Sequence, residues 1–209
     1  FPMIIYDGML KYANFSPDIL QNIENRIGLQ LQDVEDEERK ENGFLAIDLI
    51  DYIYAVLHSV TYRDTYHDFL QNDFPTIPYP ASAEYFFKMA EFGKRLRYLH
   101  ELKGIDRKDL ITTYPVIGEK DNNVVLIHKF EETNEGIGRV WINKEQYFDG
   151  VPLESWNMII TGYQPLEKWL KDRKDKHLTS DEIIHYQKMV VALVKTIRTQ
   201  EKIDEIIEL

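Results

Sequence analysis

The sequence has 209 residues and a mass of 24.8 kDa, and its 44% hydrophobic content is enough to build a core, which excludes a disordered tail. The absence of cysteine excludes a disulfide framework, a thiolate-bound metal and a thiol nucleophile. No apolar run approaches the roughly 18 residues of a membrane span, so we expect a soluble, cytoplasmic protein without a membrane partner. Because the chain begins at Phe1 without an initiator methionine or signal peptide, we expect a piece of a longer protein.

The 25 basic and 36 acidic residues give a net charge of −11, which as a global property argues against nucleic-acid binding. The charge is unevenly distributed, however. Residues 32–41 hold six acids and two bases, and residues 201–209 hold four acids and one base, whereas residues 168–176 hold five bases and two acids. The distribution allows a positive face at 168–176, although a solvated helix surface of mixed charge is the alternative.

The first half of the chain is predicted to be helical after a short apolar strand at residues 1–6. A helix is expected within residues 14–28, where Ser16 can cap it, Pro17 suits its first position and Gly28 can end it. Apolar spacing predicts further helices at 44–58, 62–71 and 82–102. Residues 73–80 must be extended, because they contain three prolines, each of which restricts its own backbone and that of the residue before it.

The second half begins with a sheet. Strands are predicted at 110–117, 124–130 and 137–143, with turns at 118–123 and 131–136, and such short connections favour antiparallel pairing. Helices resume from Pro152, including a segment at 163–174 and a long helix from Ser180, whose start has a capping box of Thr179 and Glu182. We therefore expect an α+β fold, predominantly helical, with a small antiparallel sheet of about three strands in the middle. The 209 residues are expected to form a single domain, with a subdivision into 1–103 and 104–209 as the alternative.

Motifs for catalysis fail on spacing or context. Residues 73–79 (DFPTIPY) contain the ingredients of an amino-methyltransferase loop but spread them apart, and Gly136-Ile137-Gly138 lacks the third glycine and the helix of a dinucleotide site. Pro17-Asp18 and 38–40 (ERK) match a nuclease motif by letters only, because Pro17-Asp18 opens a helix. The six histidines show no metal-binding spacing. We expect no catalytic residue, metal ligand or cofactor site in this segment.

Two long stretches carry a family resemblance. Residues 57–80 (LHSVTYRDTYHDFLQNDFPTIPYP) and 138–193, with the blocks WINKEQYFDGVP, GYQPLEKWLKDRKDKHLT and IIHYQKMVVAL, resemble the C-terminal specificity domain of type ISP restriction-modification enzymes and related adenine-specific DNA methyltransferases. The resemblance implies a bacterial target-recognition domain that binds double-stranded DNA and follows a methyltransferase domain in the same chain. It also implies S-adenosylmethionine as a cofactor of the parent enzyme, together with ATP and Mg²⁺ where a translocase and a nuclease are present.

The sequence departs from the family pattern at three positions. Thr76 stands where members often have arginine, Thr161 stands where they often have the first of two glycines, and Asp175 stands where glycine is common. If the arginine contacts a phosphate, this chain lacks that contact.

DNA affinity should come from cations that neutralise phosphates, and specificity from side chains that reach base edges. Lys168, Lys171 and Lys174 share one helical face if the helix extends that far. Tyr163 is as readily a core residue as a DNA contact. An interaction scaffold that docks other domains without base readout is the alternative function. The phosphate candidates are Lys144, Lys168, Lys171, Arg173, Lys174 and Lys176, and the candidates for base contacts are Asn143, Tyr163 and Gln164.

Overall fold

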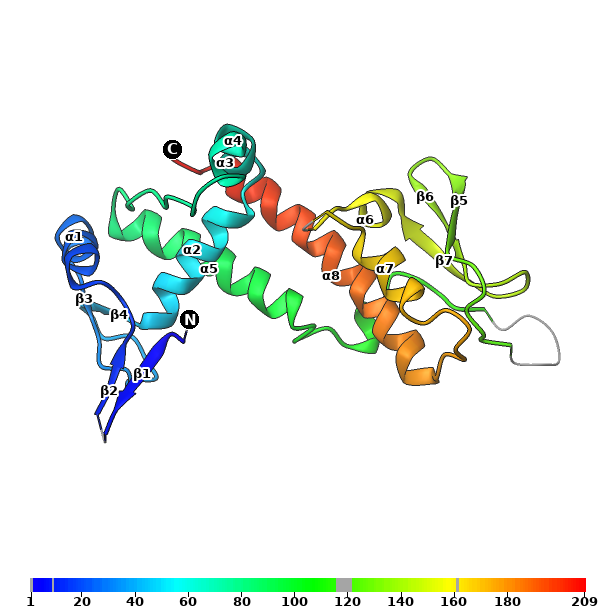
Figure 1. Cartoon of the computed structure of the whole chain (residues 1–209), viewed down its shortest axis with the longest axis horizontal. Coiled ribbons are helices and arrows are strands. Elements are labelled where there is room, and N and C mark those ends of the chain that lie inside the picture. The colour runs from blue at the N-terminus through cyan, green and yellow to red at the C-terminus, as the bar shows by residue number, and fades with distance from the viewer. Residues whose placement is uncertain (1, 9, 116–121, 161) are drawn as a thin grey trace. The chain divides into compact units, whose positions relative to one another are not determined.

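The computed structural model of the protein describes residues 2–8, 10–115, 122–160 and 162–209. The chain divides into two compact units, which we call unit 1 (residues 1–97 and 199–209) and unit 2 (residues 98–198). Helices α5 (Ala83–His100) and α8 (Ser180–Asp204) therefore contribute residues to both units (Figure 1). The predicted α+β class is confirmed, including a three-stranded antiparallel sheet.

Unit 1 is mainly helical, with two small sheets near the start of the chain. Strands β1 and β2 form an antiparallel hairpin, and β3 and β4 form a short parallel pair. Its elements are β1 (Ile4–Asp7), β2 (Leu10–Ala13), α1 (Pro17–Ile27), β3 (Gln30–Leu31), β4 (Gly43–Phe44), α2 (Ala46–His58), α3 (Val60–Thr65), α4 (His67–Leu70), and parts of α5 and α8.

Helix α1 begins and ends where the sequence predicts. Pro17 occupies its first position, and Gly28 ends it in the left-handed conformation at φ 70°, donating its N–H to the Glu24 carbonyl. Ser16 stands at the N-cap but its side chain makes no capping hydrogen bond. Ile23 and Ile27 are buried, whereas Ile19 is 51% exposed, so only part of the apolar residues of this helix enter the core.

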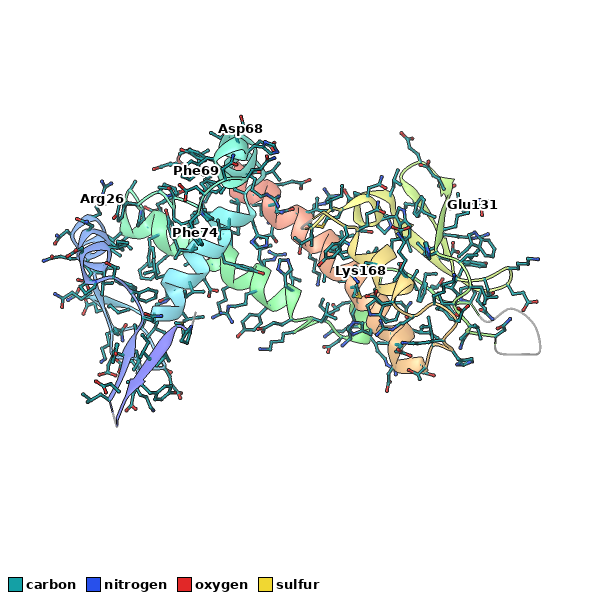
Figure 2. The ribbon with its side chains drawn as sticks, viewed as in Figure 1. Arg26, Asp68, Phe69, Phe74, Glu131 and Lys168 are labelled. Atoms are coloured by element: carbon teal, nitrogen blue, oxygen red, sulfur yellow. The ribbon has the colours of Figure 1, made fainter. Side chains whose placement is uncertain are left out.

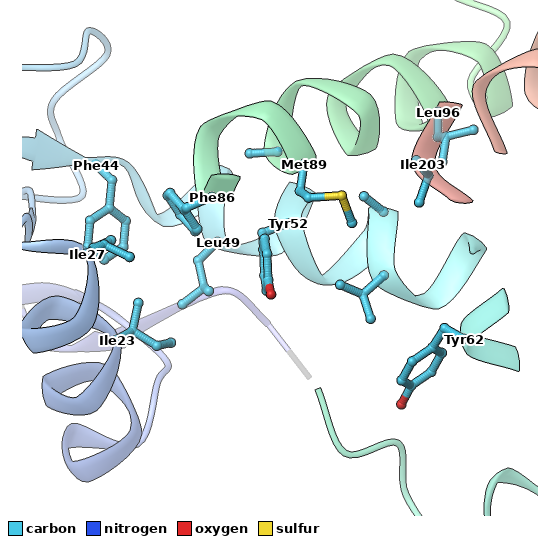
Figure 3. Close-up of a cluster of buried hydrophobic side chains, with 13 residues drawn as sticks. Ile23, Ile27, Phe44, Leu49, Tyr52, Tyr62, Phe86, Met89, Leu96 and Ile203 are labelled. Carbon is cyan, nitrogen blue, oxygen red and sulfur yellow. The ribbon is translucent and has the colours of Figure 1, made fainter. Parts of the chain in front are cut away.

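The core of unit 1 lies between α1, α2 and α5 (Figure 3). Phe86 packs against Phe44 with ring centroids 5.4 Å apart and against Tyr52 at 5.5 Å. Helices α2 and α5 approach each other backbone to backbone at Gly93, where an added Cβ would lie 1.7 Å from the Asp51 carbonyl oxygen. Glycine is required at this position by the packing of the two helices.

Two buried tyrosines hold the proline-containing segment 74–80, which forms no helix or strand. The Tyr52 hydroxyl donates to the Pro78 carbonyl at 2.8 Å, and the Tyr62 hydroxyl donates to the Thr76 carbonyl at 2.9 Å. Burial raises the pKa of both phenols, so they stay protonated donors at neutral pH. The segment is therefore fixed through its backbone.

The end of α8 attaches to the start of α3 within unit 1. The Asp204 carboxylate accepts hydrogen bonds from the Ser59 hydroxyl and from the backbone N–H groups of Val60 and Thr61. These N–H groups belong to the first turn of α3, where a carboxylate is favourable. The contact explains why residues 199–209 belong to unit 1 despite their distance in sequence.

Two aspartates buried in α2 each bind an arginine through both carboxylate oxygens. Asp48 binds Arg39 with hydrogen bonds of 2.7 and 2.9 Å, and Asp51 binds Arg97 with hydrogen bonds of 2.8 and 2.9 Å. The aspartate side chains are only 5% and 2% exposed. Pairing compensates their loss of hydration.

Unit 2 contains the sheet, ordered β5-β6-β7, and the helices that cover it. Its core joins the sheet residues Val140 and Phe148 to Leu166, Leu170 and Tyr186 of the helices. Its elements are η1 (Arg107–Asp109), β5 (Lys129–Asn134), β6 (Ile137–Trp141), β7 (Tyr147–Pro152), α6 (Leu153–Asn157), α7 (Pro165–Lys171), and parts of α5 and α8.

The sheet has the predicted number of strands, but two of them lie elsewhere in the sequence. In the described part of the predicted strand 110–117, a single bridge pairs Thr113 with Asp149, and residues 116–121 lie outside the described part. The predicted turn 131–136 is too long, because β5 continues to Asn134 and the turn to β6 is confined to residues 135–136, where Gly136 has φ 72°. Strand β7 was missed. Strand β5 is an exposed edge strand, so its polar residues look like a turn in the sequence.

The capping box that starts α8 is confirmed. The Thr179 N–H donates to the Glu182 carboxylate at 3.0 Å, and the Glu182 N–H donates to the Thr179 hydroxyl at 3.2 Å. The Thr179 N–H, and secondly Arg173, hold the pKa of Glu182 below its ordinary value. Among the described residues, no helix is both long enough and apolar enough to cross a membrane.

Candidate nucleic-acid interface

The two units differ in charge. Unit 1 carries 10 basic and 20 acidic residues, whereas unit 2 carries 15 basic and 16 acidic residues. The negative charge of the protein is therefore concentrated in unit 1. A polyanion is repelled less by unit 2, which also holds all nine candidate contacts.

Helix α7 presents part of the basic stretch. Leu166 and Leu170 are fully buried, so the helix packs this face on the core of unit 2 and leaves Lys171 and Lys168 exposed; Lys168 is labelled in Figure 2. The helix ends at Lys171. The predicted continuation of its face to Lys174 is therefore wrong, because that residue lies in the turns that follow.

Both exposed lysines of α7 are paired with carboxylates one turn away. Lys168 Nζ lies 2.7 Å from Asp172, and Lys171 Nζ lies 2.8 Å from Glu167. Glu167 also lies 3.2 Å from His128. Pairs at i, i+4 with half-exposed lysines are weak, at most about 1 kcal/mol, so phosphates can replace the carboxylates at small cost. The i, i+4 spacing of lysine and carboxylate can be recognised in the sequence, and it would have predicted that both lysines are paired.

Arg173 is held by three contacts, one of which is a hydrogen bond of 3.3 Å from its Nη1 to the Trp169 carbonyl. Its guanidinium lies 3.6 Å from the centroid of the Trp169 ring, and its Nε donates to Glu182 at 2.9 Å. The contacts tie the chain after α7 to the first turn of α8. Arg173 is thus oriented by a ring and a carboxylate, and a DNA contact would compete with the latter.

A basic loop (residues 172–178) follows α7 and pairs with an extended central segment (residues 122–127). Val125 N–H donates to the Lys176 carbonyl at 3.0 Å, and Asp175 N–H donates to the Val125 carbonyl at 2.8 Å. Asp175 has φ 62°, a left-handed conformation that favours glycine. This explains physically why glycine suits the position.

Asn143 lies on the other side of the central segment and is 2% exposed. Its Nδ2 donates to the carbonyls of Asn122 at 2.8 Å and Val124 at 3.0 Å, and its Oδ1 accepts from the N–H groups of Glu145 and Gln146, both at 2.8 Å. A carboxamide has two donors and two lone pairs. Both N–H groups and both lone pairs of the Asn143 amide therefore already make hydrogen bonds within the protein.

Three exposed lysines form what we call the lysine edge: Lys144, Lys174 and Lys176. With respect to the described residues, none of them takes part in an ion pair; Lys176 Nζ makes only a long hydrogen bond of 3.5 Å to the Asp172 carbonyl. Lys144 follows Asn143, and the other two belong to the basic loop. The central segment thus joins the two parts of the edge.

The remaining candidates precede α7. Tyr163 is 47% exposed, and Lys168 Nζ lies 5.9 Å from the centroid of its ring. Gln164 is at the N-cap of α7 without a side-chain capping bond. Gly162 has φ 88°, a backbone angle that residues with a side chain rarely adopt. Thr161 lies outside the described residues. Exposed Tyr163 and uncapped Gln164 remain candidates for base contacts.

One pocket of unit 1 lacks a group that S-adenosylmethionine sites use. A pocket of about 490 Å³ in unit 1 lies between α1, α2 and the segment 75–80, and its lining is mostly aliphatic, aromatic and proline side chains. It has no carboxylate to bind ribose hydroxyls, as nucleoside sites require. Among the residues described, no group of three or more histidines, aspartates or glutamates could hold a metal ion.

Three solved structures share this fold. A DrdV–DNA complex matches 99% of this chain with 17% identity and a TM-score of 0.67. The ATP-dependent type ISP restriction-modification enzyme LlaBIII bound to DNA matches 96% of this chain with 18% identity and a TM-score of 0.61. A nuclease-deletion mutant of the type ISP restriction-modification enzyme LlaGI in complex with a DNA substrate mimic matches 83% of this chain with 21% identity and a TM-score of 0.51. The match covers 21%, 12% and 14% of those chains, respectively.

No curated protein matches the sequence. The family model for the type ISP C-terminal specificity domain matches residues 1–209. Because the match extends over the entire chain, the protein belongs to the type ISP C-terminal specificity domain family.

Proposed function

We propose that the chain is the DNA sequence-recognition domain of a restriction-modification enzyme. Its family membership supports this, as do similar structures that contain DNA or a DNA substrate mimic. The observation that carries the proposal to particular residues is the lysine edge of unit 2, whose three exposed ammonium groups have no carboxylate partner among the described residues. Such groups are available to neutralise phosphates.

The proposed division of roles separates affinity from specificity. The lysine edge contacts phosphates directly, while Lys168 and Lys171 exchange their carboxylate partners for phosphates when DNA binds. Gln164 and Tyr163 are assigned to the bases, since a glutamine amide can pair with adenine through two hydrogen bonds. Asn143 is not assigned to a base, because its amide has no free donor or acceptor.

The test is a salt titration of duplex binding by the 209-residue chain. We expect the triple variant Lys144→Ala, Lys174→Ala, Lys176→Ala to flatten the plot of log K against log salt by about 0.9 for each lysine that contacts a phosphate. The matched control changes three exposed lysines of unit 1, Lys88→Ala, Lys94→Ala and Lys202→Ala, and should leave the slope unchanged. Equal slopes for wild type and the first variant would refute the assignment.

We further propose that the domain positions DNA for an adenine methyltransferase region of a longer parent protein, which supplies the S-adenosylmethionine site. The small share of the matched chains that this fold covers supports a larger parent. Unit 1 is the proposed docking surface for that region, because it exposes Tyr66, Phe69 and Phe74, the last at 86% (Figure 2). Cross-links from the methyltransferase region that reach only unit 2 would contradict this.

A further inference from the structure

Asn143 is buried beside an exposed lysine, and its four hydrogen bonds reach two different stretches of backbone. The Oδ1 atom accepts from Glu145 and Gln146 and so fixes the turn that follows Asn143. The Nδ2 atom donates to the carbonyls of Asn122 and Val124 in the central segment. One side chain therefore ties the turn that carries Lys144 to the central segment.

The central segment has two sides with different partners. The backbone of Asn123 and Val125 pairs with the basic loop, through Leu178 N–H to the Asn123 carbonyl at 2.9 Å and through the two bonds of Val125. The intervening residues Asn122 and Val124 face Asn143. Because neighbouring strands are about 4.8 Å apart, the two sides bring the Lys144 turn and the basic loop to roughly 10 Å from each other.

We propose that Asn143 is a positioning residue, which holds Lys144 on one side of the central segment in register with Lys174 and Lys176 on the other. The inference rests on the proposed function and adds that the lysine edge acts as one prearranged phosphate-binding unit. Ordering three lysines on DNA is costly in entropy, and a fixed backbone beneath them reduces that cost. Asn143 itself touches no DNA.

The test separates the two halves of the amide. Asn143→Ser keeps an oxygen that can accept from the turn, but it is too short to reach both carbonyls of the central segment. Asn143→Asp combined with Glu145→Gln keeps the size and net charge of the wild type and loses the donor, with Glu145→Gln alone as the control; Glu145 is exposed. Each is measured by salt titration of duplex binding, with thermal unfolding to verify that the chain is folded.

We expect both Asn143 variants to lose about three- to tenfold in duplex affinity at low salt and to flatten the salt dependence. In the Lys144→Ala, Lys176→Ala background, the same changes should have no further effect, because the residue acts through these lysines. A loss of equal size in both backgrounds would overturn the inference and indicate a direct DNA contact or general damage to the fold. So would unchanged binding by both variants.

Failure of the proposed function has a different signature. If the wild-type chain binds duplex without any dependence on the lysine edge, the proposed function fails and the positioning role fails with it. If the lysine variants weaken binding and the Asn143 variants do not, the proposed function stands and only the positioning role is refuted.

Discussion

Two buried arginine pairs of unit 1 differ from two exposed lysine pairs on α7 of unit 2. In unit 1, Arg39 and Arg97 each bind an aspartate that is almost completely buried, through two hydrogen bonds in a fixed geometry. In unit 2, Lys168 and Lys171 each pair with a carboxylate on the same stretch of chain, where the lysines are 47% and 51% exposed. The first kind of pair holds α2 to the loop that carries Arg39 and to α5, and the second leaves a cation close to the surface.

The difference follows from hydration. A buried aspartate that loses its arginine is left charged without water, so the pair cannot be exchanged. An exposed lysine that loses its carboxylate is hydrated by water, so exchanging the carboxylate for a phosphate costs little free energy. The buried arginine pairs therefore keep their partners, whereas the exposed lysine pairs of α7 form a surface that can change partners.

The largest expected effect comes from breaking a buried pair. Arg97→Met should lower the free energy of unfolding by about 3–5 kcal/mol, because it leaves the Asp51 carboxylate buried and unpaired. Lys168→Met in unit 2 should lower it by less than about 1 kcal/mol. Chemical denaturation of both variants measures the contrast.

A control identifies the cause of that loss. Adding Asp51→Asn to Arg97→Met should recover part of the stability, since the unpaired charge is then gone. If the two single variants lose similar amounts, or if the added change recovers nothing, the distinction between the units is wrong.

An intermediate effect is expected when the two carboxylates that pair with Lys168 and Lys171 are neutralised. Asp172→Asn with Glu167→Gln should raise non-specific duplex affinity roughly two- to fivefold per carboxylate, because it releases Lys168 and Lys171 and removes repulsion of phosphates. Fluorescence anisotropy at fixed salt provides the measurement.

The control for that experiment removes two acids from unit 1. Glu37→Gln with Glu41→Gln changes the net charge equally at exposed positions and should leave the affinity nearly unchanged. An equal gain in both variants would mean that total charge, not the α7 surface, governs the attraction.

The smallest expected effect is at Asp175. Asp175→Gly should raise the free energy of unfolding by up to about 1 kcal/mol, because φ 62° strains a residue with a side chain and glycine adopts it freely. The unfolding midpoint in denaturant tests this. The comparison variant Asp181→Gly, in the first turn of α8, should be destabilised; stabilisation of both would show that backbone strain is not the cause.

Local signals in the sequence predicted the helices well. Pro17, Gly28, and the Thr179–Glu182 pair mark helix ends in the structure as they do in the sequence. Each of these signals acts through hydrogen bonds or backbone angles within a few residues, so no distant contact is needed to interpret it. The prolines of segment 74–80 excluded a helix for the same reason.

Strand signals were weaker. The edge strand β5 carries polar residues that resemble a turn, and β7 contains Asp149, Gly150 and Pro152, which have low strand propensity, so the sequence did not predict it. The nine candidate residues were chosen by type and spacing. The structure distinguishes among them, because it surrounds Asn143 with backbone, pairs Lys168 and Lys171, and exposes Lys144, Lys174 and Lys176.

The sequence by itself determined the class of fold, the ends of most helices and the family, because these depend on composition, short-range hydrogen bonding and long matched blocks. Tertiary structure decided which charges are available. Asp51 and Asp68 are the same residue type in the sequence, and only folding buries the first against Arg97, 46 residues away, and leaves the second exposed. The electrostatic role of a side chain depends on the groups within a few ångströms of it, and for residues far apart in sequence the fold alone brings those groups together.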